Sequence, residues 1–160
     1  MGPGPGDRID LREYHRVLLG LSVALMIGVL VMTGGAWMMV ASGTFQPFLG
    51  LQPGVRLGVG FFLLLLLGAS YPVARAAGSG DPPENRREAL SQVQTRVMVA
   101  MATRDAVGGM AAVVILLTGD IVLGGSVAAA TLLAMASDLP RIGVLEEAVR
   151  GLPPEGTAAS

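Results

Sequence analysis

The chain lacks cysteine and lysine, and it has few charged or aromatic residues. Without cysteine, disulfides, thiolate metal sites, covalently attached haem and cysteine nucleophiles are excluded. The single histidine, His15, stands among arginines, which favours an interfacial side chain over a metal ligand. Aromatic residues make up 4% of the chain and the net charge is −1, so we expect no nucleic-acid partner.

Catalytic and nucleotide-binding motifs are also missing from the sequence. It contains no H-E-x-x-H, no Walker loop and no G-x-S-x-G. Serine and threonine nucleophiles have neither a second histidine nor a lysine to act as their base. The nine methionines have no cysteine ligands beside them, which favours flexible packing over soft-metal binding. We therefore expect no enzymatic activity from this chain on its own, no cofactor and no metal.

What the sequence does contain is apolar surface. Of its 160 residues, 52% are hydrophobic and only 14% are charged, whereas a soluble domain carries about 25% charged residues. A chain of this length cannot hide so much apolar surface from water. Arginine supplies all eleven basic residues, and glycine, alanine and valine abound, which is typical of a GC-rich prokaryotic genome. The composition predicts a multi-pass protein of a prokaryotic inner (plasma) membrane.

Two uncharged runs predict the first two membrane helices, at about 17–40 and 55–77. Trp37 lies near the outer end of the first run, as expected for an interfacial aromatic residue. The neutral loop between the runs is expected to lie flat on the outer interface. Pro72 lies in the last turns of the second run and predicts a kink or an early end.

A helix is expected to begin in water after the second run. Asp81 is suited to cap its N-terminus, with Pro82 at the first helical position. The region 81–104 is predicted to form a cytoplasmic helical loop that continues into the membrane as the span 97–118.

The apolar stretch that follows holds one acid, Asp120. As a single helix, 106–137 would be about 48 Å long, more than a hydrocarbon core of about 30 Å. Gly119 suits a helix C-terminus and Asp120 an N-cap, so the stretch predicts two helices, 97–118 and 121–137. Asp120 is then a cap at the outer interface. The alternatives are a buried functional carboxylate or an acid that faces a partner subunit.

Arginines before the first run, after the second and in the tail place both chain ends in the cytoplasm. The prediction is an all-α integral membrane protein with four transmembrane helices in two hairpins, N-in and C-in. The alternative has three helices and an outer C-terminus. A disordered segment 1–12 precedes the membrane domain 13–138, and a cytoplasmic tail 139–160 follows. Apolar residues of the tail are expected on the membrane surface or on a partner: Ile142, Val144, Leu145 and Val149.

Small residues recur at helical spacing along three of the predicted spans and predict close helix packing, within the bundle or against a partner. They are Gly20, Ala24, Gly28, Gly108, Gly109, Gly124, Gly125, Ser126, Ala130 and Ala134. The apolar part of the chain holds one charged constellation, the adjacent Arg104 and Asp105 together with Asp120. Arg104 and Asp105 are expected at the inner margin of the membrane, neutralising each other or reaching for the interface.

These features favour a small non-catalytic membrane subunit that packs against other membrane proteins in a larger complex, possible hosts being energy-transducing or transport complexes. A second hypothesis is a homo-oligomeric ion or proton transporter that uses Asp120 and the Arg104–Asp105 pair. A third is a membrane-bound regulator that docks a partner through 81–104. In all three, the lipid bilayer and other membrane chains, or further copies of this one, are the expected partners.

Overall fold

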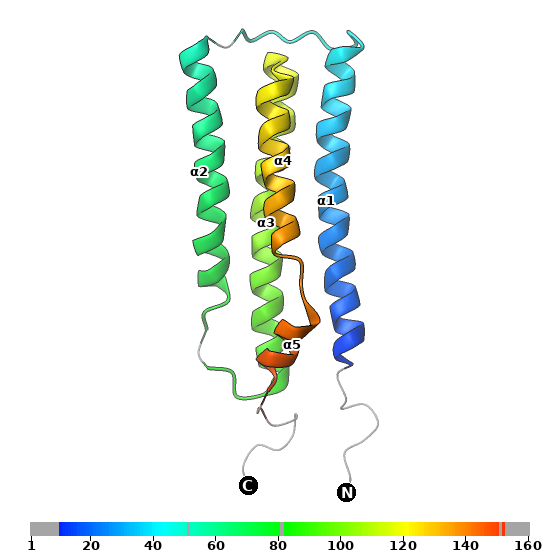
Figure 1. The fold of residues 1–160 in the computed structure, drawn as a ribbon, viewed down its shortest axis with the longest axis vertical. Coiled ribbons are helices and arrows are strands. Elements are labelled where there is room, and N and C mark those ends of the chain that lie inside the picture. The colour runs from blue at the N-terminus through cyan, green and yellow to red at the C-terminus, as the bar shows by residue number, and fades with distance from the viewer. Residues whose placement is uncertain (1–9, 51, 81, 151, 153–160) are drawn as a thin grey trace, which may run out of the picture.

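The computed structural model describes residues 10–50, 52–80, 82–150 and 152. Across these residues the chain is all-helical, as predicted (Figure 1). Its helices, in chain order, are α1 (Leu11–Ala41), α2 (Pro53–Ala77), α3 (Arg86–Thr118), α4 (Ile121–Ser137) and α5 (Ile142–Ala148).

Three of these helices, α1, α2 and α3, are long and apolar enough to cross a membrane. The fourth candidate span is broken: α4 is followed by α5 at an angle of 50°. The chain turns back between α3 and α4, so α4 runs toward the end of the bundle where α1 begins but stops well short of it (Figure 1). A single helix through this region, as the three-helix alternative needs, is therefore not formed.

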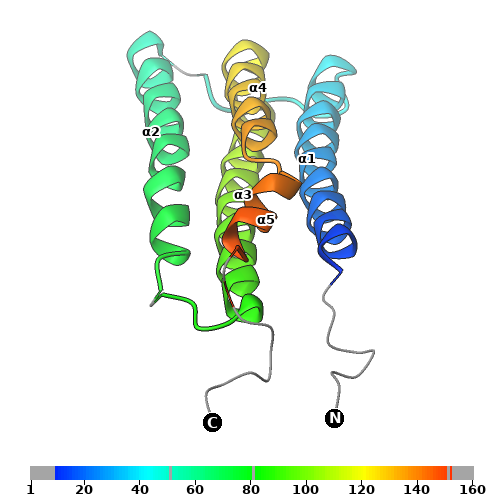
Figure 2. The same ribbon diagram turned by 60° about the horizontal axis from the view of Figure 1, so that its bottom comes forward.

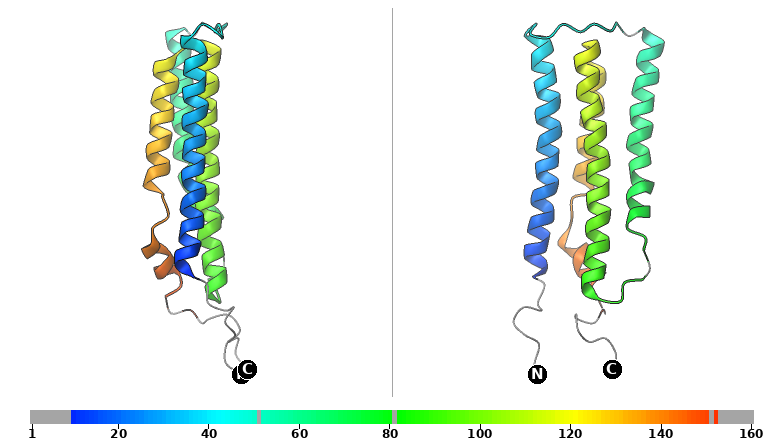
Figure 3. Two further views of the ribbon diagram at one scale, coloured as in Figure 1. Left: turned by 90° about the vertical axis from the view of Figure 1, so that its right-hand side faces the viewer. Right: turned by 180° about the vertical axis from the view of Figure 1, so that it is seen from behind.

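Helices α1 to α4 form a diamond in cross-section. Helix α3 packs against α1, α2 and α4, and α4 also touches α1 and α2. In the described part of the chain, α1 and α2 share no contact. Figure 3 shows α3 and α4 on opposite sides, with α1 and α2 at the flanks. The connection from α1 to α2 crosses above the α3–α4 turn, where Leu49 N–H donates to Leu117 O at 3.0 Å.

Part of the tail packs on its own bundle. Leu145 of α5 is completely buried in a cluster with Leu18 of α1 and Leu90 of α3. Helix α5 lies across α3 at this end of the bundle (Figure 2). His15 Nε2–H donates to Pro140 O at 2.8 Å and so holds the α4–α5 linker against α1. Ile142 and Val144 stay exposed.

Three predictions about where helices begin or end differ from the structure. Helix α3 begins at Arg86, because Asn85 caps it by accepting from Glu88 N–H at 2.9 Å. The predicted cap, Asp81, lies outside the described residues. Helix α2 continues past Pro72 to Ala77, so the proline does not end it. Helix α1 begins at Leu11, inside the segment 1–12 that the sequence predicted to be disordered; residues 1–9 lie outside the description.

Candidate functional site

The structure places a charged side chain at each end of the short helix α4, and these two ends form the candidate site. At the N-terminal end, Gly119 adopts a left-handed conformation, φ 70°, and closes α3. Asp120 follows as the N-cap of α4, with its Oδ1 accepting from Leu123 N–H at 2.9 Å. The predicted turn and the predicted cap are therefore confirmed. The chemistry is local: a carboxylate satisfies a free N–H and complements the positive end of the helix dipole.

Asp120 has a second partner that the sequence did not indicate. Arg56, in the first turns of α2, places Nε 2.6 Å from Asp120 Oδ2, and its Nη2 donates to Oδ1 at 3.1 Å. The Asp120 side chain is only 14% exposed, whereas that of Arg56 is 46% exposed. The ion pair joins α2 to the α3–α4 turn and neutralises the carboxylate at this end of the bundle.

Arg104 of α3 occupies the other end of α4 and is completely buried. Its Nη1–H donates to Ala134 O at 3.1 Å, and its Nε–H donates to Ser70 Oγ at 3.3 Å. Its Nη2 lies 2.7 Å from Asp138 Oδ2 as an ion pair, although no N–H aligns with the oxygen as a hydrogen bond requires. The guanidinium also lies 4.4 Å from the ring centroid of Tyr71. Arg104 thus joins α2, α3 and the end of α4.

These contacts satisfy backbone carbonyl groups and the helix dipole at the C-terminus of α4. The last carbonyls of a helix have no partners within it, and the negative end of the dipole attracts a cation. Helix α4 has no basic residue in its last turn, and Pro140 cannot continue it. Arg104 supplies both the donor and the positive charge from the neighbouring helix. Helix α4 is therefore capped by an acid at one end and by an arginine from α3 at the other.

The expected pairing of Arg104 with Asp105 is wrong. Successive residues on a helix point about 100° apart, and the two side chains face different neighbours. Arg104 faces α2 and α4 and pairs with Asp138. Asp105 is half-buried on the side of α1, with Oδ1 4.0 Å from where a Cβ on Gly28 would lie. Arg104 neither reaches for the interface nor neutralises its neighbour in sequence.

The predicted small-residue positions separate into packed and open ones. A Cβ on Gly108 would lie 2.7 Å from Val29, and one on Gly124 would lie 2.8 Å from Ala111 O. Gly109, Gly28, Ala130 and Ala134 are partly or fully buried within the bundle. By contrast, nothing lies within 4 Å of a Cβ on Gly20 or Gly125. The remaining two positions, Ala24 and Ser126, are exposed.

Sequence reasoning missed four members of this site: Arg56, Ser70, Tyr71 and Asp138. Asp138 did carry a signal, because an acid directly after an apolar helix is a candidate partner for a cation at the membrane margin. Nothing in the sequence indicated which arginine that partner is.

No protein-family model, curated protein or solved structure matches the chain. The functional argument therefore depends on the geometry of its own residues.

Proposed function

We propose that the chain is a small non-catalytic subunit of a prokaryotic plasma-membrane complex and packs beside other membrane helices. The observation that carries this proposal is the role of the two charged side chains at the ends of α4. Asp120 and Arg104 each cap an end of α4, and each is paired with an oppositely charged side chain. Charges engaged in this way hold a short helix in a bundle.

The polar groups between the two ends of α4 also favour a structural subunit over a protein that conducts ions. The hydroxyls of Thr118, Ser126 and Thr131 donate to carbonyls of their own helices, at 2.6, 2.7 and 2.8 Å. About 24 Å of helix separates Arg104 from Asp120. A relay over that distance needs polar groups that face one another. The third hypothesis, docking through 81–104, has only the outer face of α3 to offer a partner, because Ala89, Leu90 and Met101 of this region are buried in the bundle.

Partner contact is expected at the open small residues of α4 and α1. Gly125 and Ser126 on α4, and Gly20 and Ala24 on α1, leave surface that a helix of another subunit can approach closely. The apolar exposed faces of these helices suit a membrane partner, such as an energy-transducing or transport complex.

To test this, we would extract the full chain from its native membrane in mild detergent, measure the particle mass and identify co-purifying proteins. Stoichiometric larger partners are expected. Gly125→Leu and Gly20→Leu should reduce the retained partner about tenfold, because each inserts a side chain between close helices. Gly58→Leu is the control, since its site on α2 is equally open. A particle that contains only copies of this chain would contradict the proposal.

The substitution Asp120→Asn distinguishes the subunit hypothesis from the transporter hypothesis. Asparagine is also a good N-cap, and the exposed Arg56 contributes little through its ion pair, so we expect a stability loss under about 1 kcal/mol and intact assembly. Proton or ion flux through membranes containing the complex should be unchanged. Loss of flux with normal assembly would instead support the transporter hypothesis.

A further inference from the structure

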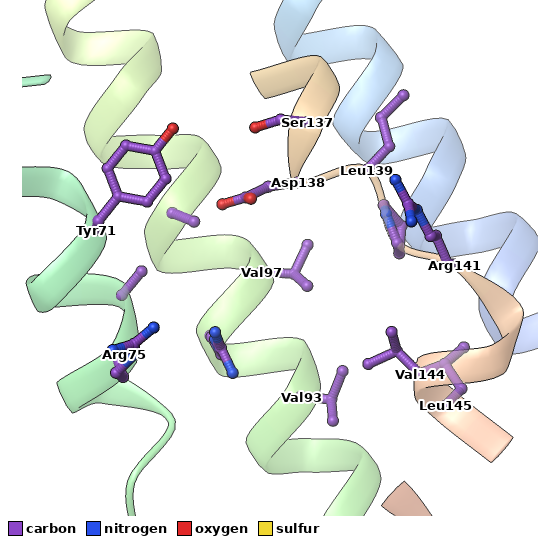
Figure 4. A pocket seen from close by; sticks show the side chains of 14 residues that line it. Tyr71, Arg75, Val93, Val97, Ser137, Asp138, Leu139, Arg141, Val144 and Leu145 are labelled. Carbon is purple, nitrogen blue, oxygen red and sulfur yellow. The ribbon is translucent and has the colours of Figure 1, made fainter. Parts of the chain in front are cut away.

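A pocket of about 580 Å³ lies directly beside the Arg104 site, between α2, α3 and the α4–α5 linker. Three arginines from three different segments line it: Arg75, Arg96 and Arg141. Figure 4 shows Arg75 and Arg141 on opposite sides of the opening. The apolar part of the wall comes mainly from α3 and α5, including Val97 and Leu145.

The charge of this pocket is uncompensated. Asp138 also lines it, but its carboxylate is paired with the buried Arg104. Among the described residues, Arg75, Arg96 and Arg141 form no ion pair. Three guanidinium groups around one cavity, with the one acid among its described lining residues already neutralised, create a site for an anion. Arginine is suited to phosphate because its planar fork donates two parallel hydrogen bonds.

An apolar groove of about 510 Å³ continues from this pocket along α2 and α4. Tyr71 and Ser137 line both spaces, so the groove and the pocket meet at these residues. Leu64, Leu67 and Leu133 form its walls, and Gly68 leaves it open because nothing lies within 4 Å of a Cβ there. The combined shape is a cationic pocket joined to an apolar channel.

The positions of the pocket and the groove along the bundle match the headgroup and hydrocarbon layers of a bilayer. The α3 residues of the pocket, from Val93 to Ala100, lie about 30–40 Å along the helix from the turn at Asp120. With a hydrocarbon core of about 30 Å, this is the level of the headgroups on the arginine-rich side. The groove residues of α4, from Ala130 to Ser137, lie about 15–25 Å from the same turn, within the hydrocarbon.

We propose that this pocket and groove bind one anionic phospholipid, with its phosphate among Arg75, Arg96 and Arg141 and an acyl chain along the groove between α2 and α4. Charge complementarity selects the headgroup, and the apolar extension selects a lipid over a free anion. The lipid fills the space between α2 and the α4–α5 linker at the level where α4 ends.

The test is native mass spectrometry of the full chain, in the particle in which it is extracted, during titration with phosphatidylglycerol or with phosphatidylcholine of the same acyl chains. We expect phosphatidylglycerol to bind about tenfold more tightly. Arg75→Gln with Arg141→Gln should weaken it about tenfold or more, since each arginine near the headgroup contributes. Arg12→Gln with Arg16→Gln, the matched control, removes the same charge from exposed positions at the same end of the bundle.

The acyl-chain contribution is tested at two open glycines of α2. Gly68→Leu fills the groove and should weaken phosphatidylglycerol binding about tenfold, whereas Gly58→Leu should not. These variants and the comparison of two lipids remain informative if the arginine variant fails to fold. Equal binding of the two lipids, or an equal loss in the Arg12/Arg16 control, would overturn the proposal. Displacement by inorganic phosphate, with no effect of Gly68→Leu, would make the pocket a phosphate site and also overturn it. The partner-retention experiment with Gly125→Leu is independent of either result.

Discussion

Asp138→Asn is expected to destabilise the bundle more than removal of Arg104, its partner. The substitution keeps the shape of the side chain but leaves the charge of Arg104, which is completely buried, without a counter-ion. Breaking a buried ion pair in this way costs about 3–5 kcal/mol. We expect about 3 kcal/mol, the lower end of that range, because the Asp138 side chain is 39% exposed and water shares in its solvation.

Arg104→Met should cost less, about 1–2 kcal/mol. It removes the buried charge together with its desolvation penalty, and methionine fills much of the space. Ala134 O retains a donor, because Ser137 Oγ donates to it at 2.8 Å. Asp138, left unpaired, is exposed enough to be hydrated. The double substitution should resemble Arg104→Met alone, so the two effects should fail to add by about 3 kcal/mol.

Reversible denaturant unfolding in detergent micelles, followed by loss of helical circular dichroism, measures these differences. Arg56→Gln provides the control at the opposite end of α4, where the arginine is 46% exposed and its ion pair is worth about 1 kcal/mol or less. If Asp138→Asn costs no more than Arg104→Met, the negative charge does not compensate the buried guanidinium, and the description of Arg104 as a paired cap is wrong.

The features predicted correctly from the sequence are those that depend on residues close together in the chain. Gly119 and Asp120 specify a turn because their backbone and capping preferences act within three residues, and a single helix over the apolar stretch would be longer than the hydrocarbon core. The same locality explains the error at Arg104. Its nearest acid in sequence, Asp105, is on a different side of the helix, and the acid that pairs with it lies beyond the next helix. Only the packing of α3 against α4 brings Asp138 within reach.

Long-range pairing also explains why the second partner of Asp120 was not predicted. Arg56 lies 64 residues away, and many arginines at a helix end would satisfy the sequence equally well. The small-residue pattern has a similar limit. Periodicity shows which residues share a helix face, but the rotation of each helix in the bundle decides which face is packed. Gly124 and Gly125 are adjacent in sequence, yet one is buried against α3 and the other is open.

This pair of glycines supplies the second large expected effect. Gly124→Ala should destabilise the bundle by about 1–3 kcal/mol, because the added methyl group would overlap the side chain of Ile115 and approach Ala111 O to 2.8 Å. A backbone carbonyl of α3 cannot rotate away, so the two helices must separate. Gly125→Ala meets nothing within 4 Å and should be neutral or stabilising by up to about 1 kcal/mol, because alanine restricts the unfolded chain.

The comparison uses the same unfolding measurement on two substitutions of identical chemistry, one residue apart. Helix propensity changes equally in both variants, so the difference between them isolates the contact between α3 and α4. Gly108→Ala extends the test to the contact between α3 and α1, where the new methyl group would lie 2.7 Å from the side chain of Val29. That neighbour is a side chain rather than backbone, so its cost should fall below that of Gly124→Ala. Equal stability of the Gly124 and Gly125 variants would mean that α4 is rotated about its axis relative to the arrangement described above. In that case the open face assigned to a partner would lie against α3 instead.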